Sequence, residues 1–550
     1  MTMELIIIGF GPVAGYKYSR CIHNAVSDGH LSRYHVIDRE SQQQQVEARL
    51  AKLPTKPATC TYIPEHVLQN GPDSGIEWIV RQDMFTKPGV RRKVVVMTEP
   101  QSHGAYINYA LAKGFDILVT KPIVLPMKNG VMNRQALMPS VHHIAKASAD
   151  AGVRTAVLCL SRLHEIYEEK VRKPVALMMD RLQHPITSVH IKTASGVWNL
   201  PSEFGSREDH PYKYGYGMLM HGAYHYIDNL ACLLLMNKKL FPNEEFVIVM
   251  QGFTAGPHDQ QMRTGDLEKQ TTGYRPEFSK LPDGHQYGET DIVASFAMKF
   301  RSSGRVLCLG TISLEQTTPG IRSWGPFPDV PYNINGRMHC TDVDVRLGTV
   351  FSISANVSKQ PIYARLDDND LRGLNAAHVV TRANARLART QGFVRHEHYE
   401  RPYGNSYSYS AECDVFERWL LDKPTQSDFE SHVPTCAILD GLLKLAADDW
   451  RGNVEIDFNY PTPDWPVLSE EEDSWYGYMS DDVAFAFESK QRKPIVKNGV
   501  NGVNGVNRVN GVHGVHSANG VNGVNGVNGV NGVNGVNGTN GVHRVNGVKV

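Results

Sequence analysis

The stretch IIIGFGPVAG, residues 6–15, decides how this chain begins to fold. An apolar run ends at Gly9, and the spacing of Gly9, Gly11 and Ala14 follows the pattern G-x-G-x-x-A. The first glycine permits a tight turn, the second lets a pyrophosphate approach the backbone, and the third small residue lets the next helix pack closely on the strand. The free amides at the start of that helix face the bound anion. The stretch therefore predicts a strand, a turn and a helix that together bind a dinucleotide.

The next predicted strand, residues 34–37, ends in the acid Asp38. A carboxylate at this position binds the ribose hydroxyls of NAD and repels the 2′-phosphate of NADP. Arg39 beside it attracts such a phosphate, so we expect NAD and keep NADP as the alternative. A glycine-rich turn without a ligand is the competing interpretation. The predicted cofactor contacts in this region are Gly9, Phe10, Gly11, Pro12, Val13, Ala14, Asp38 and Arg39.

Strand and helix patterns alternate through the first 150 residues. Short apolar strands around a helical pattern, as at 93–97, 101–113 and 116–119, predict βαβ units and a parallel sheet. Residues 40–93 are polar and broken by prolines, so loops and short helices are expected there.

The pattern changes after about residue 150. Segments such as 291–300 and 305–315 alternate with period two, which predicts a large, mostly antiparallel open sheet with one covered face. The expected fold is α/β, a Rossmann dinucleotide-binding domain followed by an α+β domain with this sheet. From Asn498 the chain repeats Asn-Gly-Val. Burial of one small apolar side chain per triplet contributes less free energy than the loss of conformational entropy costs when the backbone is ordered. The predicted domains are 1–150 (Rossmann), 151–460 (α+β, substrate binding and oligomerisation), 461–496 (C-terminal extension) and 497–550 (disordered repeat tail).

The net charge and the cysteine pattern limit the kinds of binding partner and the compartment that we expect for this chain. The formal net charge of the 550 residues is zero, which predicts neither a nucleic-acid nor a membrane-surface partner. We find no apolar run of transmembrane length and no signal peptide. The eight cysteines are scattered without a CxxC pair, which is typical of reduced thiols and predicts a cytoplasmic protein.

A longer resemblance starts at MTEPQSHGAYINYALAKGFDILVTKP, residues 97–122. This stretch resembles the Gfo/Idh/MocA oxidoreductases, the glucose–fructose oxidoreductase and inositol dehydrogenase group, in its strand, T-x-P-like turn, histidine, helix, strand and K-P. The resemblance continues in SRLHEIYEEKV (161–171), in HGAYHYID (221–228) and in the closing segment 438–458. It implies an NAD(P)-dependent oxidoreductase. It also implies cofactor-side contacts at Thr98, Glu99, Pro100, His103, Thr120, Lys121, Pro122 and Arg162; for His103, a plain helix-start role is the alternative.

The stretch GYGMLMHGAYHYID, residues 215–228, spaces His221, His225 and Asp228 by four and three. If it is helical, the three side chains share one face. Such a face could bind a metal ion, transfer protons in catalysis or be an ordinary polar helix surface. We expect no metal, because the glutamate of HExxH is missing and the chemistry of the similar family needs none.

The resemblance implies the catalytic roles. His225 is expected to act as acid/base and Lys121 to hold the substrate oxygen. His221 stands where the family has an aspartate, and we expect it to relay protons or contact substrate; Asp228 orients His225 or packs. Thr120 replaces the family's glutamate.

These residues predict hydride transfer between a nicotinamide and a hydroxyl or carbonyl of a polar small molecule, such as a sugar, polyol or cyclitol. Two alternatives stay open. One is a dinucleotide-binding sensor without turnover, resembling the galactose-regulon repressors of yeasts. The other is redox-assisted bond cleavage of the glycosidase type with recycled NAD. A homo-oligomer, dimer or tetramer, through the exposed face of the large sheet is also expected.

Overall fold

The computed structural model describes most of the chain up to Thr462. The described residues are 2–11, 14–69, 71–81, 89–194, 204–205, 210–257, 287–316, 339–361, 373–388, 394–402, 406–447 and 451–462. They all lie in the first of the two units into which the chain divides, Met1–Lys490. Pro12 and Val13, nearly all of the predicted extension and the whole repeat tail lie outside the described residues.

The first sheet has six parallel strands in the order β3-β2-β1-β4-β5-β8. Apolar runs form its inner strands because both faces are buried, and Leu5 to Ile8 of β1 are at most 1% exposed. The predicted Rossmann architecture is thus confirmed, and β8 extends this sheet to Leu158. Its strands are β1 (Thr2–Ile8), β2 (Arg33–Arg39), β3 (Thr59–Ile63), β4 (Val90–Val96), β5 (Asp116–Thr120) and β8 (Thr155–Leu158).

One strand of this sheet was not expected. Residues 40–93 contain β3, which pairs with β2 at the sheet edge, as well as the expected loops and short helices. Its sequence TCTYI is mixed, and only its last residue is buried. An edge strand with so little burial carries no apolar run, so the sequence pattern did not reveal it.

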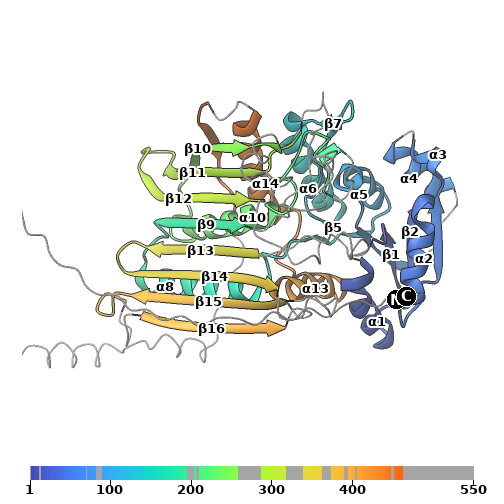
Figure 1. Ribbon diagram of the computed structural model, residues 1–550, viewed down its shortest axis with the longest axis horizontal. Coiled ribbons are helices and arrows are strands. Elements are labelled where there is room, and N and C mark those ends of the chain that lie inside the picture. Colours follow the sequence, from blue (N-terminus) through green and yellow to red (C-terminus); the bar gives the residue numbers. More distant parts are fainter. Residues whose placement is uncertain are drawn as a thin grey trace, which may run out of the picture. The chain divides into compact units, whose positions relative to one another are not determined.

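Helices cover both faces of the parallel sheet (Figure 1). Alternate side chains of β1 point to opposite faces, so Ile6 and Ile8 join one core and Leu5 and Ile7 the other. The helical segments of this region are the π-helical η1 (Ala14–Tyr18), α1 (Ser19–Ser27), α2 (Gln43–Ala51), α3 (Glu65–Leu68), α4 (Pro72–Arg81), α5 (His103–Ala112) and α6 (Leu137–Ala151). A small hairpin, β6 (Met127–Lys128) and β7 (Val131–Met132), precedes α6.

The second sheet has nine strands in the order β16-β15-β14-β13-β9-β12-β11-β10-β17. Only the β9–β12 pair is parallel, so the predicted, mostly antiparallel sheet is confirmed. Its strands are β9 (Ser188–Ala194), β10 (Phe246–Ala255), β11 (Asp291–Phe300), β12 (Val306–Glu315), β13 (His339–Leu347), β14 (Phe351–Pro361), β15 (Gly373–Ala383), β16 (Val394–Pro402) and β17 (Val454–Asp457).

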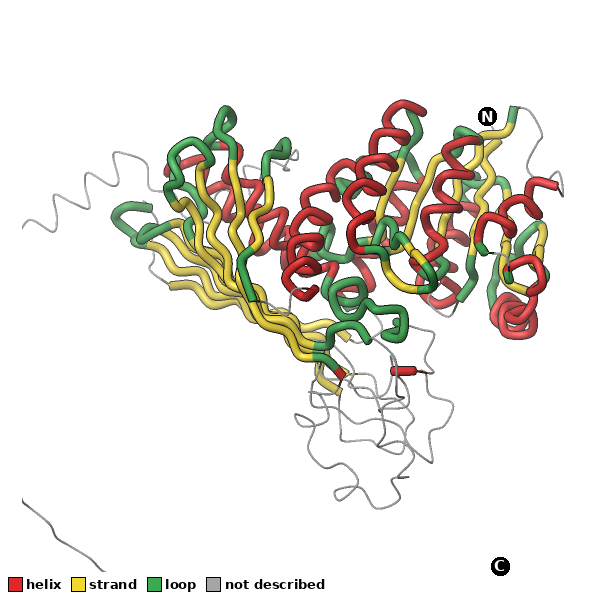
Figure 2. Tube along the Cα trace, turned by 90° about the horizontal axis from the view of Figure 1, so that it is seen from above, coloured by secondary structure: helices red, strands yellow, loops and turns green. Residues whose placement is uncertain are grey.

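Helices of the described chain lie against one face of this sheet, and the other face carries none of them (Figure 2). They are α7 (Glu165–Tyr167), the π-helical η5 (Glu168–Arg172), α8 (Lys173–Leu182), α10 (Tyr224–Leu235) and α14 (Val433–Ala447). Every residue of α10 is buried, because it packs between β9 and α14. None of the described helices is long and apolar enough to cross a membrane.

The closing helix α13 (Tyr407–Leu420) returns to the first sheet. Phe416 and Trp419 join the core that covers α1 and β1, and Trp419 accepts a hydrogen bond at its carbonyl from the buried Lys93 of β4 (Nζ to O, 2.6 Å). The segment that follows the large sheet therefore completes the dinucleotide-binding half.

Candidate functional site

The glycine turn lies at the carboxyl end of β1, in the middle of the parallel sheet. Gly9 has φ +85°, and a Cβ there would come within 2.8 Å of the carbonyl oxygen of Met97. Both features require glycine at this position. Gly11 differs, since a Cβ built on it meets no atom of the described residues within 4 Å. Open space beside this backbone is what a pyrophosphate needs for its approach to the turn.

Asp38 at the end of β2 braces the same turn. Its Oδ2 accepts the amide of Phe10 at 2.6 Å, and its Oδ1 accepts the amide of Arg39 at 2.7 Å. Each carboxylate oxygen keeps a second lone pair for another donor. Arg49 of α2, which the sequence analysis did not single out, donates Nη1 to the carbonyl of Phe10 at 3.0 Å. The turn is thus held by one carboxylate and one guanidinium.

His103 is a structural link between three segments. Its Nδ1 lies 2.8 Å from the carbonyl oxygen of Pro122, and its Nε2 lies 3.0 Å from that of Thr98 and 3.3 Å from the hydroxyl of Thr120. The side chain is fully buried, and burial lowers its pKa to about 4. A neutral imidazole donates to Pro122 and accepts from Thr120, so its nitrogens are used within the protein. These contacts fit the helix-start alternative, and the cofactor-side role of His103 stays a prediction.

Two further predicted cofactor contacts, Glu99 and Pro100, begin the short turn before α5. The carbonyl of Glu99 accepts the hydroxyl of Ser102 at 2.9 Å, and the same hydroxyl lies 2.8 Å from that of Thr98. This turn follows β4, the neighbour of β1, so it borders the glycine turn.

Lys121 follows β5, and its peptide bond to Pro122 is cis. Its ammonium Nζ lies 3.4 Å from Nε2 of His210, a residue that the sequence analysis missed. The ring of His210 packs edge-on against that of His221 at 4.9 Å between centroids. His221 Nε2 lies 3.1 Å from the carbonyl oxygen of Pro211, which makes this nitrogen the donor.

The three residues of the 215–228 stretch do not share one helix. Residues 218–223 form turns, and α10 begins only at Tyr224. His225 and Asp228 therefore lie on α10, whereas His221 precedes it.

His225 is a buried imidazole under the influence of two ammonium groups. Burial, and then the charge of Lys121, lower its pKa well below the usual value; Lys17 of η1, next to the glycine turn, lowers it further. His225 is therefore neutral at neutral pH. Its Nδ1 lies 3.4 Å from Sγ of Cys159, and among the described residues none forms a hydrogen bond with its Nε2.

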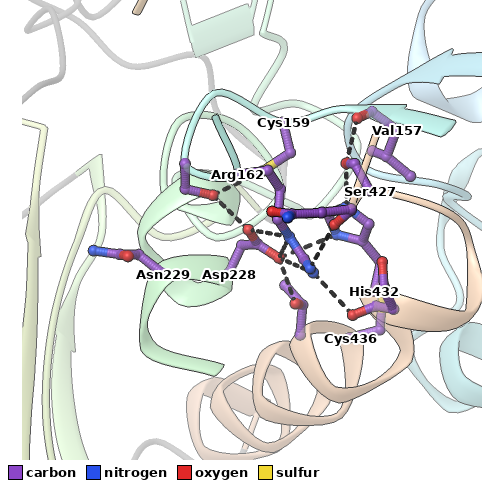
Figure 3. A network of polar contacts seen from close by, with 12 residues as sticks. Val157, Cys159, Arg162, Asp228, Asn229, Ser427, His432 and Cys436 are labelled. Atoms are coloured by element: carbon purple, nitrogen blue, oxygen red, sulfur yellow. Dashed lines mark hydrogen bonds and ion pairs between the residues drawn. The ribbon is translucent and has the colours of Figure 1, made fainter. Parts of the chain in front are cut away.

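Asp228 is the centre of a buried polar network (Figure 3). Arg162 donates Nε and Nη2 to this carboxylate at 2.7–3.0 Å, and Thr435 donates its hydroxyl to Oδ1 at 2.8 Å. Burial alone would raise the pKa of Asp228, but Arg162 and His432 hold it well below its usual range. Arg162 also donates to the carbonyls of Gln426 and Ser431. Its guanidinium is thus engaged in this network, and among the described residues its hydrogen-bond partners lie outside the glycine turn.

A hydrogen-bond chain joins Asp228 to His225. The ionised carboxylate can only accept, so the hydroxyl of Ser161, which contacts Oδ2, must donate to it. Ser161 Oγ is then free to accept the thiol proton of Cys159 at 3.2 Å, and burial keeps that thiol protonated by raising its pKa. The sulfur in turn accepts from Nδ1 of His225. The chain therefore places the proton of His225 on Nδ1 and leaves Nε2 as a base.

Cys159, Asp228 and His432 bring possible metal-ligand atoms within 4.8 Å of one another. The same carboxylate already faces the guanidinium of Arg162 at 2.7 Å, and a cation would have to displace or oppose that charge. The arrangement is suited to a charge pair with hydrogen bonds, and unsuited to a metal.

Sequence reasoning missed Arg49, Cys159, Ser161 and His210. Ser161 opens a segment that was noticed, SRLHEIYEEKV, but a lone serine or cysteine carries no pattern. His210 lies close to the noticed stretch 215–228, and its nearness to Lys121 depends on chain segments 89 residues apart.

No protein-family model and no curated protein sequence matches this chain. Solved structures with a similar arrangement are Gfo/Idh/MocA-type oxidoreductases. One is an oxidoreductase from Agrobacterium radiobacter in complex with NAD+, L-tartaric acid and magnesium (11% identity, 83% of this chain and 99% of that chain, TM-score 0.45). A second is an aldose-aldose oxidoreductase from Caulobacter crescentus (12% identity, 82% of this chain and 99% of that chain, TM-score 0.45). A third is an inositol dehydrogenase homologue from Azotobacter vinelandii with NADH and myo-inositol (11% identity, 83% of this chain and 97% of that chain, TM-score 0.44). At these identities the likeness concerns the fold alone.

Proposed function

We propose that this protein is an NAD-dependent oxidoreductase acting on a hydroxyl or carbonyl group of a polar small molecule. The observation that carries the proposal is His225, whose pKa is lowered by burial and then by the charge of Lys121, and whose Nδ1–H is directed into the Cys159–Ser161–Asp228 chain. This arrangement supplies a neutral base on which the charge of an ammonium group acts. Lys17, which follows the glycine turn on η1, also lowers the pKa of His225 through its charge, so the turn and this imidazole act on each other electrostatically.

The glycine turn fits a dinucleotide. Open space beside Gly11 accommodates the pyrophosphate, and the remaining lone pairs of Asp38 accept the adenosine ribose hydroxyls. We propose NAD rather than NADP, because a 2′-phosphate would approach this carboxylate; Arg39 and Arg49 are the residues that would favour NADP. The bound nicotinamide supplies the hydride acceptor or donor.

The chain's own residues handle the proton and the oxygen. Lys121 holds the substrate oxygen and stabilises the negative charge that develops on it. His225 accepts the hydroxyl proton at Nε2 during oxidation and returns it during reduction. His221, whose Nε2–H is given to the carbonyl of Pro211, relays protons or contacts the substrate.

A direct test compares coenzyme reduction by the wild-type chain and by two variants, on a panel of sugars and polyols followed by nicotinamide absorbance. Lys121→Met and His225→Gln should each lower kcat by at least about a hundredfold. Lys113→Met, at an exposed lysine that ends α5, is the matched control and should keep wild-type activity. Unchanged turnover in both site variants would overturn the assignment.

The same assay separates the alternatives. A dinucleotide sensor would bind NAD and reduce none with any substrate, and the replacements Thr120 and His221 at the family's acidic positions are what keeps that hypothesis open. Redox-assisted cleavage would give product without net NADH. The presence of Lys121 and of a neutral His225 favours the oxidoreductase over the sensor, because binding of a dinucleotide alone requires neither residue.

We also propose that two or more copies associate through the uncovered face of the large sheet, in the cytoplasm. Three apolar side chains on this face, Phe253, Val293 and Leu309, are 78%, 48% and 56% exposed, and all eight cysteines are free thiols. Sedimentation of wild type and Phe253→Asp tests the association. We expect the variant to shift toward the monomer, and a wild-type monomer would contradict the proposal.

A further inference from the structure

Two cysteines lie where the helix that follows the glycine turn meets the closing helix. Cys21 belongs to α1 and Cys413 to α13. The two helical regions pack together here, and the ring of Tyr18 stacks on that of Phe416 at 4.8 Å between centroids with 22° between the planes. Neither the proposed oxidoreductase site nor the buried network around Asp228 includes these thiols.

Polar contacts hold α13 against the residues just before α1. Lys17 of η1 forms an ion pair with Glu412, and the carbonyl oxygen of Lys17 accepts the hydroxyl of Tyr409 at 3.2 Å. The same carbonyl accepts the thiol of Cys413, whose Sγ lies 3.6 Å away. Cys21 stands about one helical turn beyond Lys17. These contacts fix Cys413 beside the part of the helix that carries Cys21.

The two thiols also contact each other through a side-chain hydrogen bond. This bond lowers the pKa of Cys413 and raises the pKa of Cys21, and it is the largest influence on both. Cys413 is therefore the member of the pair that ionises first, and Cys21 is the thiol that donates to it. The side chain of Cys413 is partly exposed, whereas that of Cys21 is buried. An accessible, readily ionised thiol with a second thiol beside it is what a redox-sensitive pair requires.

We propose that Cys413 and Cys21 form a reversible disulfide when the protein meets a peroxide. The Cys413 thiolate attacks one oxygen of hydrogen peroxide, the O–O bond breaks, and a sulfenic acid and a hydroxide result. The sulfur of Cys21 then attacks the sulfur of Cys413. The S–S bond forms, the S–O bond breaks, and the hydroxyl leaves with the proton of Cys21 as water. In all, two thiols lose two electrons and two protons, and the peroxide becomes two waters.

The disulfide joins α13 covalently to the helix that leaves the glycine turn. Disulfides of cytoplasmic proteins are usually transient and redox-sensing, so a bond of this kind agrees with the compartment proposed above. It also closes a long loop, because the two cysteines lie far apart in the chain.

The experiment is peptide mapping of the full-length protein after brief treatment with hydrogen peroxide, alkylation of the remaining thiols and digestion without reductant. We expect a peptide pair that links Cys21 to Cys413 and disappears with dithiothreitol. Cys60→Ser, at the exposed cysteine of β3, is the matched control and should give the same pair. Absence of this pair from the treated wild-type protein would overturn the proposal, as would a Cys413 linked mainly to another cysteine.

A second measurement assigns the two roles. In Cys21→Ala the sulfenic acid on Cys413 has no thiol to resolve it, so dimedone should label Cys413 at least about tenfold more than in wild type. In Cys413→Ala, Cys21 should stay unlabelled, because its thiol is buried and protonated. Equal labelling of Cys413 in wild type and Cys21→Ala would contradict the pairing, and labelling of Cys21 in Cys413→Ala would contradict the order of attack.

Discussion

Replacing Asp228 by asparagine removes one negative charge from a fully buried site while keeping the shape of the side chain. The guanidinium of Arg162, itself 4% exposed, would then lie in the interior without its counter-charge. Removing one partner of a buried ion pair costs about 3–5 kcal/mol, because the remaining charge stays desolvated. We expect the free energy of unfolding of Asp228→Asn to fall by that amount.

The assay is urea unfolding at pH 7, followed by tryptophan fluorescence, with the midpoint and the slope both measured. Asp150→Asn on helix α6 provides the control. Its carboxylate pairs with Lys146 at 2.8 Å, and the two side chains are 64% and 75% exposed, so the loss should stay below about 1 kcal/mol. If Asp228→Asn loses no more than Asp150→Asn, the buried network does not stabilise the fold.

Other predictions concern the base, the pH response and the turn. Ser161→Ala breaks the chain that places the proton of His225 on Nδ1, so kcat should fall by about tenfold or more with KM little changed; an unaltered kcat and pH profile would contradict it. Burial lowers the pKa of His103 to about 4 and that of His164 to about 3, so the unfolded state binds more protons below pH 6.5. The free energy of unfolding should therefore fall as pH drops from 6.5 toward 4, by about 2 kcal/mol per imidazole between pH 7 and 5, and His164→Phe should make that slope shallower in urea titrations. Gly9→Ala should lower the melting temperature and abolish dinucleotide binding, because its φ of +85° and its close neighbours exclude a Cβ; wild-type melting would refute this.

The dinucleotide half of the fold was predictable because its cues are local. The residues of IIIGFGPVAG supply the strand, the turn and the small side chains within ten positions. Asp38 could be placed near the turn because strands that neighbour each other in such sheets end at the same edge. Its contact with the amide of Phe10 fits that expectation.

The site beyond the turn depends on distant contacts that no local pattern carries. The helix that was considered for 215–228 starts only at Tyr224, because the preceding backbone packs against another segment: Met218 donates its amide to the carbonyl of Glu289 at 2.8 Å. A Cβ on Gly217 would lie 2.0 Å from that same oxygen. Asp228 likewise finds Arg162 and Thr435, which are 66 and 207 residues away in the chain. Periodicity could place these residues on elements but could not pair them.

The most direct test of the central claim is NADH binding, followed by fluorescence, to wild type and to Gly11→Val. Space beside Gly11 is open, so valine should leave the melting temperature unchanged while it fills the volume that a pyrophosphate requires. The account predicts that wild type binds NADH and that the variant binds at least about tenfold more weakly. A wild-type protein without affinity for the coenzyme, or a folded Gly11→Val variant that binds it equally well, would contradict the account.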